Sequence, residues 1–293
     1  MKLAVAIMSF NRPPYFERVL QSINQQTDKD VDFYSFQDGA INKYSWRRCA
    51  NYSDITKCIE LYNFYIPKGK QYISKTNLGI AESFNKAEEI LFIEKGYDRV
   101  LFLEDDLVLS PWYISIIKKM LDAYSETEVG MVCAYGDHNI TLEAQFKYPN
   151  MVKPIDHLWG YATWKDKWEE RKPYYDEWFE FTKGKDYMMR DHKKISEWYD
   201  SIEFKTLATS QDAARTISML RADQVGIATV SNNGEYIGKI GQHNSPKNTK
   251  RHPDLTANMK RPPYTEDVGP FIYKEGTMID ILIDLDEKWR NDI

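Results

Sequence analysis

Short apolar runs alternate with helical patterns through the first half of this 293-residue chain, and this alternation constrains the fold most. Residues 3–8 are continuously apolar, as expected for a strand that is covered on both faces. Phe16, Val19, Leu20 and Ile23 then recur at the spacing of one helix face. Further strands are expected at 31–36, 71–74, 100–103 and 129–134, and further helices at 55–62, 80–91 and after 110–111. The alternation predicts an α/β fold, a mostly parallel sheet flanked by helices.

Polar residues follow the expected strands. They comprise 9–12 after the first strand, Asp38-Gly39 after the second, 77–79 after the third and Glu104-Asp105-Asp106 after the fourth. In parallel sheets, ligands bind at the carboxyl ends of the strands. We therefore expect these segments to meet at one edge of the sheet and to form the functional site there.

The acidic triplet Glu104-Asp105-Asp106 directly follows the apolar run Val-Leu-Phe-Leu. Three adjacent carboxylates repel one another, and the end of a buried strand is partly desolvated. A bound Mg²⁺ or Mn²⁺ ion, which prefers oxygen ligands, would relieve this conflict. The alternative is an exposed acidic turn that interacts with the dipole of the following helix. The position after an apolar strand favours the metal interpretation.

Several segments resemble GT-A glycosyltransferases. LFLEDDLVLSP resembles their metal-binding acidic motif, especially the Glu-Asp-Asp form of N-acetylglucosaminyltransferase-like enzymes. VAIMSFNRPPYFERVLQSI resembles the first strand and helix of those enzymes and of family 2 glycosyltransferases, and SKTNLGIAESFNKA resembles their Asn-x-Gly segment. HLWGYATWKDKWE resembles the Trp-Gly-Trp-Ala-Thr-Trp signature of bacterial nucleotide-diphospho-sugar transferases, with Tyr161 replacing the second Trp. SQDAARTISM and IGQHNS fall where those proteins carry their late Asp and His motifs.

The resemblance implies a GT-A type, Rossmann-like fold in one compact unit. Residues 1–150 would bind the nucleotide sugar, and residues 151–293 would bind the acceptor and carry a C-terminal lid. The implied function is a metal-dependent, inverting glycosyltransferase that uses a nucleoside diphosphate sugar, with a UDP-sugar favoured. Asp106 and His243 would bind Mn²⁺ (or Mg²⁺), and Asp212 would be the general base.

The resemblance also implies the remaining contacts. The donor-side residues would be Ser9, Asn11, Arg12, Asp38, Asn77, Gly79, Glu104 and Asp105, and the acceptor-side candidates are Trp159, Gly160 and Trp164. Purely structural roles stay open for these residues. Arg12 can pair with a carboxylate, Asp38 can be a turn residue, and Asp212 can cap a helix. Likewise, His243 can be an ordinary loop residue, and the tryptophans can belong to the core.

The segment 247–261 is rich in Lys and Arg and lacks periodicity. It can form a basic lid over the diphosphate, remain a solvated tail, or contact an anionic acceptor. A carbohydrate or lipid-linked acceptor is favoured. The net charge of −5 argues against a generic nucleic-acid binder but leaves a local basic patch open.

Two other functions remain as alternatives. A sugar nucleotidyltransferase would share the sheet and the carboxylates, but such enzymes usually carry a Gly-rich loop after the first strand, and SFNRPP has no glycine. A non-catalytic carbohydrate- or nucleotide-binding protein is disfavoured by the intact triplet and the late Asp.

No apolar run reaches the roughly 18 residues that span a bilayer. The three cysteines show no metal-type spacing, which indicates reduced thiols in a cytoplasmic protein, with peripheral membrane attachment left open.

Overall fold

The structure is a computed structural model that describes residues 2–136, 145, 151–155, 157–204, 206 and 208–238. The strands of the main sheet are β1 (Leu3–Ser9), β2 (Asp32–Gln37), β3 (Lys70–Ile73), β4 (Arg99–Glu104), β6 (Val129–Cys133), β7 (Val152–Pro154), β8 (Tyr161–Trp164) and β9 (Val225–Thr229). Their order is β3-β2-β1-β4-β8-β6-β9-β7. All run in one direction except β8 and β7, which are antiparallel to their neighbours. The expected mostly parallel sheet is therefore present.

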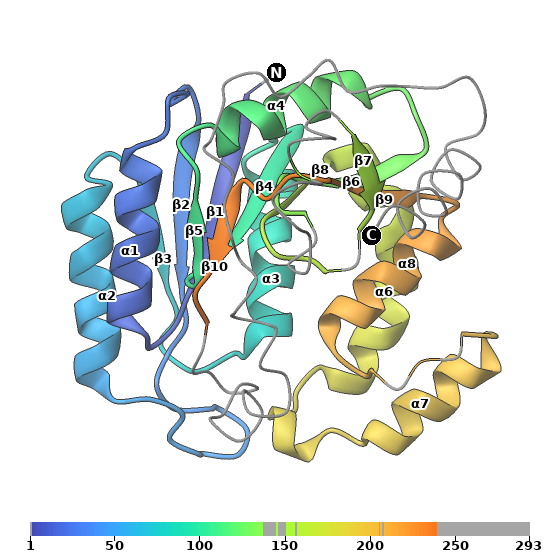
Figure 1. The fold of residues 1–293 in the computed structure, drawn as a ribbon. Helices are drawn as coiled ribbons and strands as arrows, with labels where there is room; N and C mark the ends of the chain where they lie inside the picture. The colour runs from blue at the N-terminus through green and yellow to red at the C-terminus, as the bar shows by residue number, and fades with distance from the viewer. Residues whose placement is uncertain are drawn as a thin grey trace.

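Helices flank this sheet (Figure 1). They are α1 (Pro13–Asn24), α2 (Tyr52–Tyr65), α3 (Ile80–Glu88), α4 (Tyr113–Ala123), α6 (Lys165–Thr182), α7 (His192–Ser201) and α8 (Gln211–Arg221), with a π-helical turn η1 (Glu89–Glu94) and a 3-10 turn η2 (Tyr187–Met189). A small second sheet pairs β5 (Leu107–Leu109) with β10 (Gly234–Tyr236). Helices α1 and α2 lie together on one side, and α6 packs against α8 on the other.

The first strand and helix form for the reasons that the sequence indicates. Strand β1 is buried along its whole length, and α1 buries the expected face of Phe16, Val19, Leu20 and Ile23. The prolines occupy the first helical positions, where a missing N–H costs nothing. The N-cap residue is Arg12, and its side chain makes no capping hydrogen bond.

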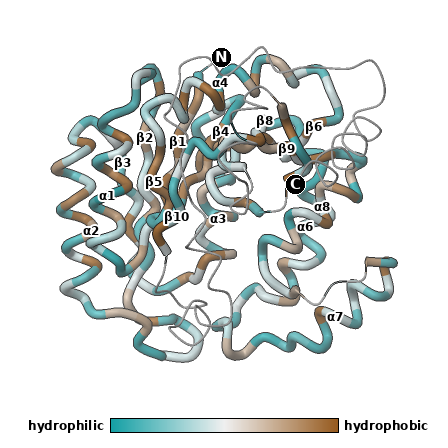
Figure 2. Tube along the Cα trace, in the orientation of Figure 1, coloured by the Kyte–Doolittle hydropathy of each residue, from teal (hydrophilic) through white to brown (hydrophobic). Residues whose placement is uncertain are grey.

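The aromatic-rich segment 155–200 supplies a second apolar cluster. Tyr175 and Trp178 of α6, Ile195 and Tyr199 of α7 and Ala214 of α8 are buried together against Ala81 of α3. Figure 2 shows apolar positions concentrated in the strands, whereas α7 is mostly hydrophilic. Much of this aromatic content is therefore core that attaches α7 and α8 to the sheet domain.

Both halves of the chain contribute to the same sheet. Strand β8, from the second half, lies between β4 and β6 of the first half.

Among the helices of the described residues, none combines the length and the apolar character needed to cross a membrane. The three cysteines form no disulfide. His243 and the expected lid at 247–261 lie outside the described residues.

Candidate functional site

The acidic triplet lies at the carboxyl end of a central strand. Glu104 is the last residue of β4, and Asp105 and Asp106 form the turn into β5. The Asp105 and Asp106 side chains are 5% and 8% exposed. Met8 of β1 pairs in register with Glu104, so the segment that follows β1 reaches the triplet. The expected convergence of these two strand ends is observed.

Arg12 bridges two of the three carboxylates. Its guanidinium binds the Asp105 carboxylate, and its Nη1 lies 2.8 Å from Oδ2 of Asp106. Although burial alone would lower the pKa of Arg12, the two carboxylates raise it. The ion-pair alternative for Arg12 is therefore what the structure shows.

The surroundings of the acidic triplet disfavour its ionised forms. Removal from water raises the pKa of Glu104 well above its usual value, and the charges of Asp106, Asp212 and Asp105 raise it further. Burial also raises the pKa of Asp106, against the opposing effect of Arg12. Arg12 pairs with Asp105 and Asp106, and an additional cation beside the triplet would favour the ionised form of Glu104.

Asp38 ties the ends of β2 and β3 together. Its Oδ1 accepts hydrogen bonds from the backbone N–H groups of Gly39 (2.8 Å) and Leu78 (2.7 Å). Its Oδ2 accepts from Asn77 Nδ2 (2.8 Å) and the Gly79 N–H (3.0 Å). Burial raises the pKa of Asp38 to about 6, although the N–H donors oppose this. These four bonds match the acceptor capacity of a carboxylate, so Asp38 shapes this turn.

Ser9 and Gln37 join the ends of β1 and β2. Ser9 Oγ donates to Gln37 Oε1 at 2.9 Å, and Gln37 Nε2 donates to the Phe10 carbonyl at 2.7 Å. Ser9 is only 4% exposed. The structure thus places Ser9 in the sheet edge beneath the site. Asn11 is partly exposed beside Arg12.

Asp212 approaches the triplet from α8. Ser210 is the N-cap of α8, and its Oγ accepts from the Ala213 N–H at 3.3 Å, so the capping alternative for Asp212 is wrong. Asp212 is partly exposed in the first helical turn, and Gln211 Nε2 donates to its Oδ1 at 2.6 Å. The effect of Asp212 on Glu104 shows that the two carboxylates lie within electrostatic range.

The segment 234–238 covers Asp106. The Ile237 N–H donates to the Asp106 carbonyl at 2.8 Å, and a Cβ built on Gly238 would lie 2.4 Å from Asp106 Oδ2. The Tyr236 ring stacks on Trp159, with ring centres 4.2 Å apart. Trp159 is partly exposed, so the structure brings this acceptor-side candidate to the side of the triplet.

Trp164 does not lie on the acceptor side, where we expected it. It pairs with Arg99, the first residue of β4, at the sheet edge opposite the triplet. It is 5% exposed, and its indole N–H donates to the Leu121 carbonyl at 3.2 Å. Trp164 belongs to the core because β8 runs antiparallel to β4.

Gly160 is required by packing. Its φ is +69°, and an added Cβ would lie 2.4 Å from the Tyr113 hydroxyl and 2.5 Å from a Leu107 methyl carbon. Gly184 has a similar φ of +75°, but the nearest atom to its Cβ, on Tyr44, would lie 3.9 Å away.

This contrast provides a matched pair of variants. Gly184→Ala should lower the free energy of unfolding by about 1–2 kcal/mol, the cost of a left-handed conformation for alanine. Gly160→Ala should lower it by about 1–3 kcal/mol more, because the new methyl group overpacks the site. Urea denaturation of both variants measures the difference. Equal losses would contradict the packing role of Gly160.

The residues fit a cation site that is shared with substrate. The described part of the chain holds no cluster of three or more His, Cys, Asp or Glu side chains arranged around a metal. Mg²⁺ is usually bound by one or two carboxylates, with waters and substrate phosphates completing its shell. Mn²⁺ accepts the same oxygen ligands. Asp105 and Asp106 supply a donor set of this kind.

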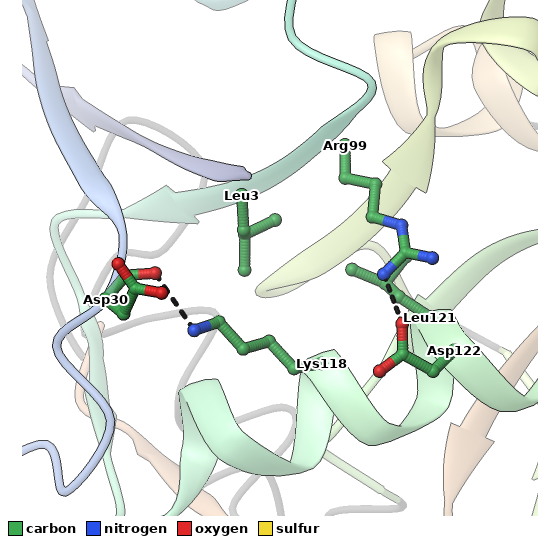
Figure 3. Close-up of a pocket in the computed structure, with 6 residues that line it drawn as sticks. All are labelled: Leu3, Asp30, Arg99, Lys118, Leu121 and Asp122. Carbon is green, nitrogen blue, oxygen red and sulfur yellow. Dashed lines mark hydrogen bonds and ion pairs between the residues drawn. The ribbon is translucent and has the colours of Figure 1, made fainter. Parts of the chain in front are cut away.

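Figure 3 shows a hollow at the amino ends of β1 and β4. It is lined by Leu3, Asp30, Arg99, Lys118, Leu121 and Asp122. Its cations are paired, since Arg99 binds the Asp122 carboxylate and Lys118 Nζ lies 2.8 Å from Asp28 Oδ1. It also lies at the edge of the sheet where ligands of parallel sheets are not expected. The triplet therefore remains the candidate site.

The sequence matches no protein-family model and no curated protein. Solved structures show partial likeness. S. aureus TarS 1–349 in complex with UDP is 12% identical over 80% of this chain and 59% of that chain, with a TM-score of 0.45. S. aureus TarS 1–349 in complex with UDP-GlcNAc is 17% identical over 47% of this chain and 35% of that chain, with a TM-score of 0.34.

A third solved structure is glucosyl-3-phosphoglycerate synthase from Mycobacterium tuberculosis in complex with Mn²⁺, UDP and glucosyl-3-phosphoglycerate. It is 12% identical over 56% of this chain and 57% of that chain, with a TM-score of 0.36. In all three comparisons, this chain covers less than two thirds of the length of the matched chain.

Proposed function

We propose that this protein is a metal-dependent, inverting glycosyltransferase that transfers a sugar from a nucleoside diphosphate sugar to an acceptor hydroxyl. One observation carries the proposal. The acidic triplet, whose Asp105 and Asp106 are buried, lies at the carboxyl end of β4, with Arg12 on one side and Asp212 of α8 within electrostatic range. The site thus offers cation-binding carboxylates and a separate, partly exposed carboxylate that can act as a base.

The donor would lie at the ends of β1, β2 and β4. Asp106 is the described residue that would bind Mn²⁺ or Mg²⁺, and His243 is a further proposed ligand. Glu104 and Asp105 would contact the donor or metal-bound water. When bound, the cation would neutralise the leaving diphosphate. Arg12 keeps both aspartates in place and adds a positive charge beside them. The turn formed by Asp38, Asn77 and Gly79 would border the nucleoside, which we propose to be uridine.

Asp212 would remove the proton of the acceptor hydroxyl. A general base must come within hydrogen-bond reach of that proton, and Asp212 is partly exposed near the triplet. A single displacement by the acceptor inverts the configuration of the anomeric carbon. Trp159, which is partly exposed beside the segment over Asp106, would contact a carbohydrate acceptor.

A thermal-shift screen of nucleoside diphosphate sugars, with and without Mn²⁺, tests the proposal. A ligand at 100 times its Kd stabilises the folded state by about 2.7 kcal/mol. For a chain of this size, we expect the matching donor with Mn²⁺ to raise Tm by about 5 °C or more. The nucleoside monophosphate, which lacks the diphosphate, is the control and should shift Tm much less. A screen in which no nucleoside diphosphate sugar raises Tm under either condition would contradict the proposal.

A further inference from the structure

A buried ion pair connects α3 to α8. Arg215 of α8 binds the carboxylate of Glu88, the last residue of α3, and their side chains are 3% and 1% exposed. The guanidinium also lies 4.6 Å from the ring centre of Tyr175 and 5.1 Å from that of Phe84. Burying two charges is costly, and such a pair is weak evidence for added stability. We therefore ask whether the Arg215–Glu88 pair fixes the position of a neighbouring group.

That neighbouring group is Gln211, one turn earlier on α8. Arg215 Nε donates to Gln211 Oε1 at 2.8 Å. Because a guanidinium has donors only, the amide oxygen of Gln211 must face it. The amide nitrogen then faces the other way, where it donates to Asp212 Oδ1 at 2.6 Å. A continuous hydrogen-bonded chain thus runs from Glu88 through Arg215 and Gln211 to Asp212.

We propose that Gln211 is a positioning residue for the Asp212 carboxylate, with its amide orientation set by the buried Arg215–Glu88 pair. This inference rests on the proposed role of Asp212 as general base. Gln211 itself is 6% exposed and does not need to touch substrate. It limits the rotation of the carboxylate, and small errors in the placement of a catalytic group strongly reduce rates.

The same hydrogen bond stabilises the ionised form of Asp212, because a donor to a carboxylate favours its charged state. Other groups also act on this carboxylate. They include Glu104 from β4, Tyr161 from β8 and Tyr175 from α6. Substituting Gln211 leaves these three side chains unchanged, so a change in the titration of Asp212 would report on the Gln211 contact.

Two substitutions separate positioning from packing. Gln211→Met keeps the size of the side chain and removes both its donor to Asp212 and its acceptor for Arg215 Nε. Gln211→Glu keeps the shape and an acceptor for Arg215 Nε but presents a second carboxylate to Asp212. We expect Gln211→Met to lower kcat about tenfold with little change in donor KM. In the pH profile of kcat/KM, the fall on the acidic side should move to higher pH by about half a unit or more in Gln211→Met. It should move further in Gln211→Glu.

Ser210→Ala is the matched control. It removes the N-cap of α8 and lowers Tm, but it leaves the contact between Gln211 and Asp212 intact. Its acidic limb should coincide with that of the wild type. A limb that moves equally in all three variants would overturn the inference, because it would then follow stability alone. Should Gln211→Met fail to fold, the nearly isosteric Gln211→Glu decides the case with the same measurement.

Failure of this inference can be distinguished from failure of the proposed function. If Asp212→Asn loses transfer while both Gln211 variants keep the wild-type kcat and pH profile, Gln211 does not position the base, but the base stands. If Asp212→Asn transfers sugar at the wild-type rate, both the base and its positioning residue are wrong.

Discussion

Asp106→Asn is expected to lower Mn²⁺-dependent sugar transfer, or hydrolysis of the donor, by about a thousandfold or more. The amide keeps the size of the side chain but removes the charge that would bind the cation. The backbone of residue 106 is held by Ile237, so the turn itself should survive the substitution. Release of nucleoside diphosphate in the presence of Mn²⁺ measures the effect.

Asp122→Asn is the matched control for that prediction. Asp122 is also a carboxylate bound to an arginine, Arg99, but it lies at the opposite edge of the sheet. Its amide variant should transfer sugar at a rate close to that of the wild type. Undiminished turnover of the wild-type protein in EDTA would contradict the role of the metal.

Asp212→Asn should lower transfer by about 10²–10⁴-fold while donor binding, measured by calorimetry, stays unchanged. The amide cannot accept the proton of the acceptor hydroxyl, and Asp212 lies outside the expected donor contacts. NMR of the wild-type product should show the opposite anomeric configuration to that of the donor. Transfer by Asp212→Asn near the wild-type rate would mean that another group is the base.

The elements with long, regular patterns were predictable from the sequence. The buried face of α1 is the expected one, and β4 at Arg99–Glu104 extends the expected strand by one residue at each end. Strong periodicity and burial on both faces determine such elements locally. The meeting of the first strand's end with the acidic triplet also followed, because parallel strands end at the same edge.

Strands β5, β8 and β10 were not predicted, although the equally short β3 was. Strands β5, β8 and β10 have only three or four residues each, too few to show a period. Strand β8 lies between two strands that precede it in the chain, and β10 pairs with β5, which lies far earlier in the sequence. The error in placing Trp164 has the same origin, since the antiparallel direction of β8 carries it away from the site.

The buried hydrogen-bonded chain from Glu88 to Asp212 was not predictable from the sequence for a different reason. Glu88 and Arg215 lie 127 positions apart, and each alone resembles an ordinary charged helix residue. One local signal was present, because Gln211 and Arg215 are four residues apart and so share one helix face. That spacing could have indicated that the residue beside Asp212 is held in place, but not by which partner.

The role of the acidic triplet is tested most directly by a calorimetric titration of UDP into the protein with and without Mn²⁺. Mg²⁺ or Mn²⁺ at this site would be shared between the protein carboxylates and the diphosphate. We expect Mn²⁺ to lower the Kd for UDP about tenfold or more in the wild type and to have little effect in Asp106→Asn. The same Kd for UDP with and without Mn²⁺ in the wild type, or an undiminished Mn²⁺ effect in Asp106→Asn, would contradict the proposed site.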